Sequence, residues 1–199
     1  MTTTVRERTK DLMRAEIAEI AVQVFAEHGF DQTTVDDAAR EAGISRATFF
    51  RYFGSKEEAV VLSVQSGGVD FGALLRERSQ ALADAASAWE LLTTVFEEGI
   101  ASIDGDPVRL RARTRMIVQT PSLRAHLTEK RRAQEQSLVA AIVEQGADVL
   151  SARVLAATAL AAYEVTWQEW ASDDTAELRD VFREVFSRVP LLTEPITDR

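Results

Sequence analysis

The chain has 199 residues and a formal net charge of −9, and its length is sufficient for one small and one larger folded unit. It has no cysteine, which excludes disulfide bonds and thiolate chemistry. Its N-terminus lacks the apolar core of a signal peptide, and no uninterrupted apolar run reaches the length of a membrane span. We therefore expect a cytoplasmic protein that makes no membrane contact.

The first predicted element is a long helix that ends at Gly29. Thr4 and Glu7 have capping-box spacing at its start. Apolar residues at helical spacing indicate that this helix covers a neighbouring element. That apolar face comprises Met13, Ile17, Ile20, Ala21, Val24 and Phe25.

Two short helices joined by a tight turn are predicted next. Thr34 has the spacing to cap the first, because its side-chain oxygen reaches the amide of Asp37. Gly43 ends this helix, since glycine adopts the left-handed conformation that a helix C-terminus commonly requires. Ser45 caps the second helix, and the pair predicts a helix-turn-helix. The apolar stripe of the first helix is Val35, Ala38, Ala39 and Ala42.

The second short helix separates an apolar face from a basic one. Phe49 and Phe53 lie four residues apart on the face that turns toward the core. From Arg46 to Lys56 there are three basic residues and no acidic one, which is the local charge that a phosphate backbone rewards. The outward-facing set is Arg46, Ala47, Phe50 and Arg51.

A further helix is predicted to begin directly after this pair. Ser55 and Glu58 have the spacing of a capping box, which places Lys56 in the first turn. A cation in the first turn opposes the helix dipole. We therefore expect Lys56 to have an anionic partner outside the fold, such as a phosphate.

The charge balance predicts a focused contact patch rather than a basic surface. Residues 1–66 contain eight basic and eleven acidic side chains, a net charge of −3. Affinity for a polyanion must therefore come from a few clustered cations. The expected patch comprises Arg6, Arg8, Lys10, Arg14, Arg46, Arg51 and Lys56, of which the first three are equally well explained as solvated terminal charges.

The remainder of the chain is predicted to be helical. Gly67 and Gly68 interrupt the helix that follows Ser55, either as a hinge or as a plain loop. Later helices are expected to begin near Ser87, Pro107 and Pro121, the last of these running to Gly146. The final two are expected to be capped by Ser151 and Asp174 and to stop at Pro190.

The run AREAGISRATFFRYFGSKEEAV, preceded by FAEHGFDQTTVDD, resembles the N-terminal DNA-binding domain of the TetR family of transcriptional regulators. The likeness extends over about residues 8–62. It implies an all-α chain with a three-helix DNA-binding domain over 1–54 and a ligand-binding and dimerisation domain over 55–199, of which 55–68 is a linking helix. The TFFRYF segment is also similar to an actinobacterial branch that includes regulators of mycofactocin genes.

The resemblance assigns roles to individual positions. Thr34 matches a phosphate-binding threonine, and Lys56 matches a lysine that grips a phosphate after the recognition helix. Phe50 stands where the family usually has tyrosine, so one hydroxyl that bonds a phosphate is missing. Tyr52 either contacts DNA or packs on the first helix. The matching recognition-helix positions are Arg46, Ala47, Thr48, Phe50, Arg51 and Tyr52.

The resemblance also implies partners. These are a double-stranded DNA operator with palindromic sequence, a small-molecule effector, and a second copy of the chain bound through the last two helices, about 151–188. Val154 to Trp170 is rich in small and apolar residues, which fits burial on more than one side. The large apolar and aromatic members of the expected effector pocket are each, taken singly, better explained as core. The expected pocket residues are Trp89, Phe96, Arg115, Met116, Leu123, Leu127, Tyr163 and Trp167.

We therefore predict a ligand-responsive DNA-binding regulator, a repressor that the effector releases. The alternative is a helical protein-interaction module without DNA binding, which leaves the cations of the recognition helix unexplained. Enzyme activity is not expected, because His28 and His126 lie in unrelated segments without a serine or carboxylate framework. We expect neither a cofactor nor a metal, since His126 and Glu129 lack a second ligand pair.

Overall fold

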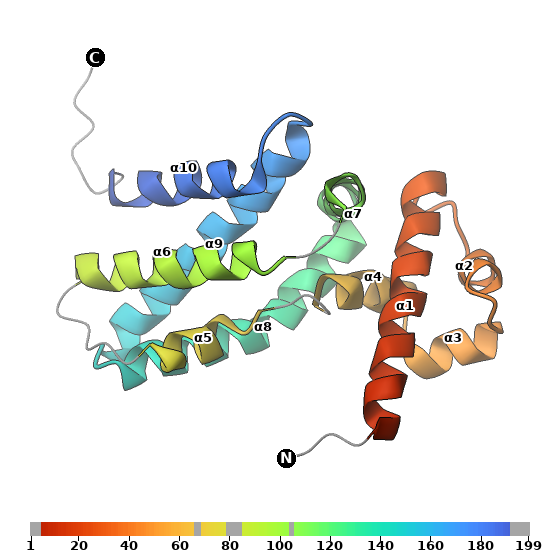
Figure 1. Ribbon diagram of the computed structural model, residues 1–199, viewed down its shortest axis with the longest axis horizontal. Coiled ribbons are helices and arrows are strands. Elements are labelled where there is room, and N and C mark those ends of the chain that lie inside the picture. The colour runs from red at the N-terminus through yellow and green to blue at the C-terminus, as the bar shows by residue number, and fades with distance from the viewer. Residues whose placement is uncertain (1–4, 66–68, 79–84, 104–105, 192–199) are drawn as a thin grey trace. The chain divides into compact units, whose positions relative to one another are not determined.

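The computed structural model describes residues 5–65, 69–78, 85–103 and 106–191. Within these residues every regular element is a helix, which confirms the all-α prediction (Figure 1). The helices are α1 (Val5–His28), α2 (Val35–Glu41), α3 (Arg46–Tyr52), α4 (Lys56–Gln65), α5 (Phe71–Glu77), α6 (Ala85–Ala101), α7 (Pro107–Gln119), α8 (Pro121–Glu144), α9 (Val149–Ser172) and α10 (Leu178–Leu191).

Packing divides the chain into two compact units. Unit 1 comprises residues 1–68 and 105–129, and unit 2 comprises 69–104 and 130–199. Unit 1 therefore includes α7 and the first turns of α8 in addition to α1–α4. The domain boundary at 54/55 stays a prediction. The expected hinge at Gly67–Gly68 and the capping threonine Thr4 lie outside the described residues.

In unit 1 the helix-turn-helix packs on α1, as Figure 1 shows. Gly29 ends α1 with φ +87° and Gly43 ends α2 with φ +65°, both left-handed conformations that favour glycine. The expected apolar face of α1 is buried at Ile17, Ala21 and Phe25. Met13 was expected in this face and is 49% exposed, because among residues 9–28 of α1 burial begins only at Ile17.

Unit 2 is built around aromatic side chains from α5, α6, α9 and α10. Phe71 and Phe96 stack with ring centroids 3.9 Å apart. Trp89 stacks on Phe186 at 5.3 Å and donates its indole N–H to the Phe186 carbonyl at 3.3 Å. Because each stacked pair joins two different helices, the core is defined by tertiary contacts.

Two glycines of unit 2 allow close approach. A Cβ on Gly99 would lie 2.4 Å from a ring carbon of Phe71, and one on Gly72 would lie 2.6 Å from the backbone carbonyl carbon of Ser137. Real Cβ atoms do not approach other atoms so closely. Helix α5, which carries Gly72, was not predicted from the sequence.

Some helix ends differ from the predictions. Asp148 rather than Ser151 caps α9, because its carboxylate accepts from the amides of both Leu150 and Ser151 at 3.0 Å. Helix α10 begins at Leu178, not after Asp174. Pro190 does not stop α10 but lies inside its last turn. The starts of α7 and α8 at prolines are confirmed.

Helix α9 is long and apolar enough to cross a membrane when judged by length and composition, with a mean hydropathy of 1.3 over 18 residues. The sequence-based expectation counted only uninterrupted apolar runs, and Arg153 and Glu164 interrupt this one. Core helices of soluble proteins pass the same test. Only 28% of that segment is buried within the chain, so α9 presents much of its apolar surface outward.

Candidate nucleic-acid interface

Helix α2 begins with a complete capping box at the expected position. The Asp37 amide donates to the Thr34 hydroxyl oxygen at 3.2 Å, and the Thr34 amide donates to the Asp37 carboxylate at 3.0 Å. The Thr34 hydroxyl also donates to that carboxylate at 2.6 Å, and these bonds hold the pKa of Asp37 below its ordinary value. The cap leaves Thr34 exposed at the N-terminus of α2.

Helix α3 separates its two faces as predicted. The Thr48 amide donates to the Ser45 hydroxyl at 3.1 Å, which confirms the cap. Phe49 and Phe53 are 0% and 1% exposed, with ring centroids 4.9 Å apart. The opposite face is open to solvent, and Thr48 is half-buried beside it. The exposed residues are Arg46, Ala47, Phe50 and Arg51.

Arg46, the first residue of α3, is held by two neighbours. Its Nη1 donates to the Asp36 carboxylate at 2.9 Å, an ion pair between α2 and α3. Its guanidinium carbon lies 5.4 Å from the Phe50 ring centroid, within cation–π range. The side chain stays on the surface, since Arg46 is 61% and Asp36 51% exposed.

Arg51 and Tyr52 occupy the end of α3. The guanidinium of Arg51 lies 5.6 Å from the Tyr52 ring centroid. The Tyr52 hydroxyl contacts the sulfur of Met13 at 3.9 Å, so the ring packs toward α1. Of the two roles considered for Tyr52, this geometry favours packing on the first helix, and a DNA contact stays a prediction.

Lys56 has partners inside the fold, contrary to expectation. Its ammonium donates to the backbone carbonyl of Phe30 and lies 4.1 Å and 5.1 Å from the ring centroids of Phe30 and Phe25. Burial lowers the pKa of Lys56, although the negative charges of Asp31 and Glu57 oppose this effect. The sequence could not reveal these contacts because Phe25 and Phe30 are far away in the chain. The phosphate role of Lys56 stays a prediction.

Arg14 was expected in the contact patch but acts within the unit. Its Nε donates to the Tyr52 carbonyl at 3.0 Å, and its Nη2 pairs with Glu58 at 2.9 Å. Glu58 in turn accepts from the Gly54 amide at 2.8 Å, while its own amide donates to Ser55 at 3.0 Å. Arg14 therefore ties α1 to the end of α3 and the start of α4.

The expected effector-pocket residues fall into two groups. Arg115, Met116, Leu123 and Leu127 belong to unit 1, and Trp89, Phe96, Tyr163 and Trp167 belong to unit 2. Within unit 2 the Tyr163 ring lies 5.4 Å from that of Phe96 and 6.0 Å from that of Trp167. Burial raises the pKa of the Tyr163 hydroxyl. Phe96 itself is 0% exposed and is a core residue.

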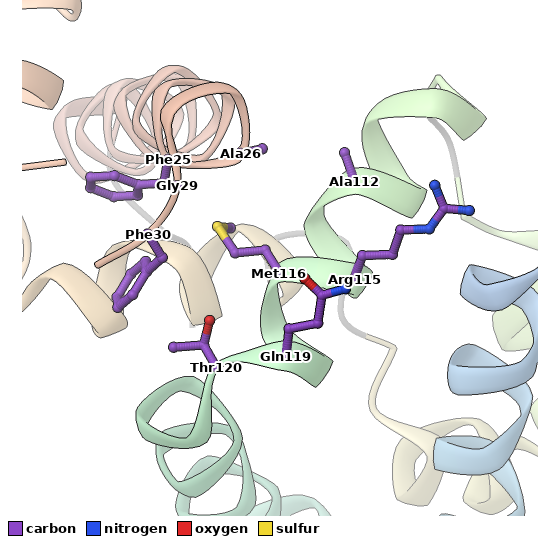
Figure 2. A pocket seen from close by; sticks show the side chains of 9 residues that line it. All are labelled: Phe25, Ala26, Gly29, Phe30, Ala112, Arg115, Met116, Gln119 and Thr120. Atoms are coloured by element: carbon purple, nitrogen blue, oxygen red, sulfur yellow. The ribbon is translucent and has the colours of Figure 1, made fainter. Parts of the chain in front are cut away.

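A cavity of about 310 Å³ lies between α1 and α7 in unit 1. Figure 2 shows Phe25, Phe30 and Met116 at one end, while the guanidinium of Arg115 points away from them. In the same helix the Arg113 side chain is only 12% exposed and pairs with Glu19 at 3.3 Å. Burial lowers the pKa of Arg113. Arg113 is therefore a packing residue of α7 rather than a solvated cation.

Two family models match the chain. One, described as bacterial regulatory proteins of the tetR family, matches residues 17–60. The other, described as the MftR C-terminal domain, matches residues 86–191. Together they cover the helix-turn-helix and α6 to α10.

Relatives of known name share part of this sequence. A protein named as a mycofactocin biosynthesis transcriptional regulator, MftR, of Mycobacterium tuberculosis is 38% identical over 116 residues, which is 55% of this chain and 54% of that protein. The regulator TcmR of Streptomyces glaucescens is 27% identical over 175 residues, covering 83% and 76% of the two chains. The match spans about half the length of the first of these relatives.

Solved structures share the fold. The regulator FadR of Bacillus subtilis, solved with stearoyl-CoA, has a TM-score of 0.61 at 22% identity and covers 87% of this chain and 95% of its own. NalD, a repressor of a multidrug efflux pump in Pseudomonas aeruginosa, has a TM-score of 0.60 at 18% identity over 90% and 94% of the two chains. At these identities the likeness concerns the fold alone.

Proposed function

Since this chain belongs to the TetR family of bacterial regulatory proteins, we propose that it is a ligand-responsive transcriptional repressor. In this proposal it binds a palindromic operator as a homodimer in the cytoplasm and is released by a small, largely apolar effector. The observation that carries the proposal is the face of α3, where Arg46, Phe50 and Arg51 are exposed above a buried pair of phenylalanines.

DNA contact is supported by the chemistry of that face. A recognition helix needs outward cations for phosphates and short or planar side chains for base edges. Thr34 and Lys56 flank the face at helix starts, where phosphates are favoured. The acidic remainder of the chain limits non-specific binding. The proposed DNA-binding residues are Thr34, Arg46, Ala47, Thr48, Phe50, Arg51, Tyr52 and Lys56.

A mobility-shift experiment with DNA from upstream of its own gene tests the DNA proposal. We expect Arg51→Ala and Lys56→Ala each to weaken binding to all DNA sequences. Each should also reduce the slope of log binding constant against log salt concentration by about one, because one phosphate contact is lost. Arg109→Ala, an exposed cation of α7 outside the proposed set, is the matched control. If the wild type bound none of this DNA, the result would favour the alternative, a helical protein-interaction module without DNA binding.

The homodimer is proposed to form through α9 and α10. Four large apolar side chains of the 24-residue helix α9 are exposed. An exposed apolar face of this kind marks an interaction surface, because its burial against a partner is favourable. The four side chains are Val149 at 60%, Leu150 at 70%, Val154 at 58% and Val165 at 41% exposure. We favour a second copy over a membrane because the two-fold operator of the family requires two recognition helices.

Analytical ultracentrifugation tests this surface. Leu150→Glu places a charge in the apolar face of α9 and is expected to convert the dimer to monomer. Val108→Glu is the control, because Val108 is 72% exposed but lies on α7. A Leu150→Glu protein that remains dimeric would exclude α9 as the interface.

The effector is proposed to be an apolar molecule with an anionic group. This proposal draws on the stearoyl-CoA bound to FadR and on the arginines of α7, which suit a carboxylate or phosphate. Stearoyl-CoA and stearate are the probes, and release of DNA at micromolar probe is the expected result. If the protein stayed bound to DNA in the presence of both stearoyl-CoA and stearate, acyl compounds would be excluded as effectors.

A further inference from the structure

The geometry around Arg46 points to an inference that rests on the proposed DNA binding and deepens it. We infer that Asp36 and Phe50 are positioning residues that orient Arg46 to read a guanine in the major groove. Arg46 is then the base-reading cation of the recognition helix, whereas Arg51 contributes sequence-independent phosphate contact. Asp36 lies on α2 and is not among the residues assigned to DNA contact by family resemblance.

The first support is that Arg46 is restrained from two directions. Asp36 accepts from Nη1 at 2.9 Å, and the Phe50 ring lies 5.4 Å from the guanidinium carbon. An arginine carries five N–H donors in a planar fork, and one Nη1 hydrogen is used by Asp36. The remaining donors suffice for the paired contact to O6 and N7 of guanine.

The second support is the contrast with Arg51. In the part of the chain that the structure describes, Arg51 has no carboxylate within ion-pair distance and lies only over the Tyr52 ring. A cation that serves phosphates gains nothing from a carboxylate partner, because the partner cancels the charge that phosphates attract. Pairing with Asp36 therefore suits base readout, where direction matters more than net charge.

The third support is the position of Phe50, which replaces the usual tyrosine of the family. A phenylalanine ring supplies the same cation–π surface for Arg46 without a hydroxyl that would bond a phosphate. In the free protein the Arg46–Asp36 pair is exposed and weak. Docking into a groove removes water from the pair and strengthens it, so its main effect is expected in the complex.

Asp36 also places a negative charge close to the DNA. This charge lowers affinity for every sequence and is offset only where Arg46 finds its guanine. Loss of the charge is therefore expected to raise affinity for mixed-sequence DNA and to reduce discrimination. A residue with only a helix-dipole role at the start of α2 would not alter base preference.

The test uses the full-length protein and DNA selected from a random duplex library by the wild type. Dissociation constants are then measured by fluorescence anisotropy at one salt concentration for the selected duplex and for each single base-pair change. We expect one guanine in each half-site whose replacement costs the wild type about tenfold or more. Arg46→Lys is expected to remove most of that guanine preference and to leave the base preferences at the other positions unchanged.

Asp36→Asn is the decisive variant, and Glu41→Gln is its matched control. Glu41 is an exposed acid of the same helix, for which the described contacts include no ion pair to α3. We expect Asp36→Asn to lower the guanine preference several-fold while raising affinity for mixed-sequence DNA. Glu41→Gln is expected to change affinity evenly at every position. Phe50→Leu is expected to lower the guanine preference without raising affinity for mixed-sequence DNA, because it removes no charge, and Phe50→Tyr is expected to retain the preference.

Two results would overturn the inference while leaving the proposed function intact. One is an Asp36→Asn protein whose preferences all equal those of the wild type, since Asp36 would then act only as a charge. The other is an Arg46→Lys protein that keeps the guanine preference. A wild type that binds neither selected nor mixed-sequence DNA would instead refute the proposed function and the inference together. Circular dichroism melts confirm that each variant is folded.

Discussion

The α2–α3 segment and the aromatic core of unit 2 are stabilised in different ways. Helices α2 and α3 have seven residues each, and each begins with a side-chain cap. The unit 2 core combines α9, of 24 residues, with rings from three other helices. In the first region the capping bonds join residues three apart, whereas in the second the contacts join residues up to 97 apart.

Helix length explains this difference. A seven-residue helix is unstable alone, so its ends must be fixed by caps and by a glycine turn. A long helix gains its stability from packing and needs fewer local signals. The two regions should therefore respond differently to substitution. All three tryptophans, Trp89, Trp167 and Trp170, lie in unit 2, so their fluorescence follows that unit, whereas circular dichroism follows both.

The largest effect is expected from Phe96→Ala in the aromatic core. The Phe96 ring is 0% exposed and stacks 3.9 Å from that of Phe71, so its removal leaves a cavity that the rigid core does not fill. We expect a loss of about 3–5 kcal/mol in the free energy of unfolding, measured by urea titration of tryptophan fluorescence. Phe50→Ala, at 42% exposure in unit 1, is the control; followed by circular dichroism, it should cost less than about 1 kcal/mol. A loss this small for Phe96→Ala would mean that Phe96 lines an open cavity.

The next largest effect is expected from Gly72→Ala. The new Cβ would lie 2.6 Å from the Ser137 backbone, so α5 or α8 must shift. We expect a loss of about 1–3 kcal/mol in the tryptophan transition, because crowding exceeds the better helix propensity of alanine.

Gly43→Ala is the matched comparison in unit 1. Nothing lies within 4 Å of a Cβ there, but φ is +65°, so the cost is backbone strain of about 1 kcal/mol. That cost should appear as a lower midpoint of the unfolding transition followed by circular dichroism.

If Gly72→Ala did not change the free energy of unfolding, the close approach of α5 to Ser137 would not contribute to stability.

The same contrast explains which features the sequence predicted. The caps of Thr34 and Ser45, the glycine ends and the outward set on α3 are all local patterns, and all are confirmed. The resemblance to the TetR family is confirmed over 17–60, and the mycofactocin-regulator likeness is confirmed by the C-terminal match over 86–191. That second match could not be anticipated from residues, because core packing leaves no motif.

Contacts between distant segments were not predictable. Lys56 bonds Phe30 across 26 residues, Arg14 bonds Tyr52 across 38, and Arg46 pairs with Asp36 across a turn whose geometry no spacing rule specifies. Each of these cations was predicted as part of the DNA-contact patch. The structure gives each of the three a partner within the fold.

A smaller effect is expected from Ser45→Ala at the start of α3. The Thr48 amide loses its acceptor at 3.1 Å, which costs about 1 kcal/mol. The loss should shift the circular dichroism transition and leave the tryptophan transition in place if the units unfold separately. Equal shifts in both signals would indicate that the two units unfold as one. Ser45→Asp restores a cap and is expected to recover the wild-type midpoint.

The smallest effect is expected from the charge of Asp37 in the α2 capping box. Its pKa is lowered below the ordinary 3.8 by the bonds from Thr34, so the folded state favours the carboxylate. The stabilisation is therefore fully present above that ordinary pKa and is lost as pH falls through the folded value. Asp37→Asn keeps an oxygen for the Thr34 amide but removes the charge.

The melting temperatures of wild type and Asp37→Asn should therefore differ at neutral pH and should begin to converge as the pH falls below about 4. Glu41→Gln removes the same charge from α2 without breaking a capping bond and should show no such convergence. A difference that persists unchanged in acid would assign the effect to the shape of the side chain rather than to its charge. In that case the caps of unit 1 would stabilise α2 through hydrogen bonding alone, and electrostatics would not distinguish the two regions.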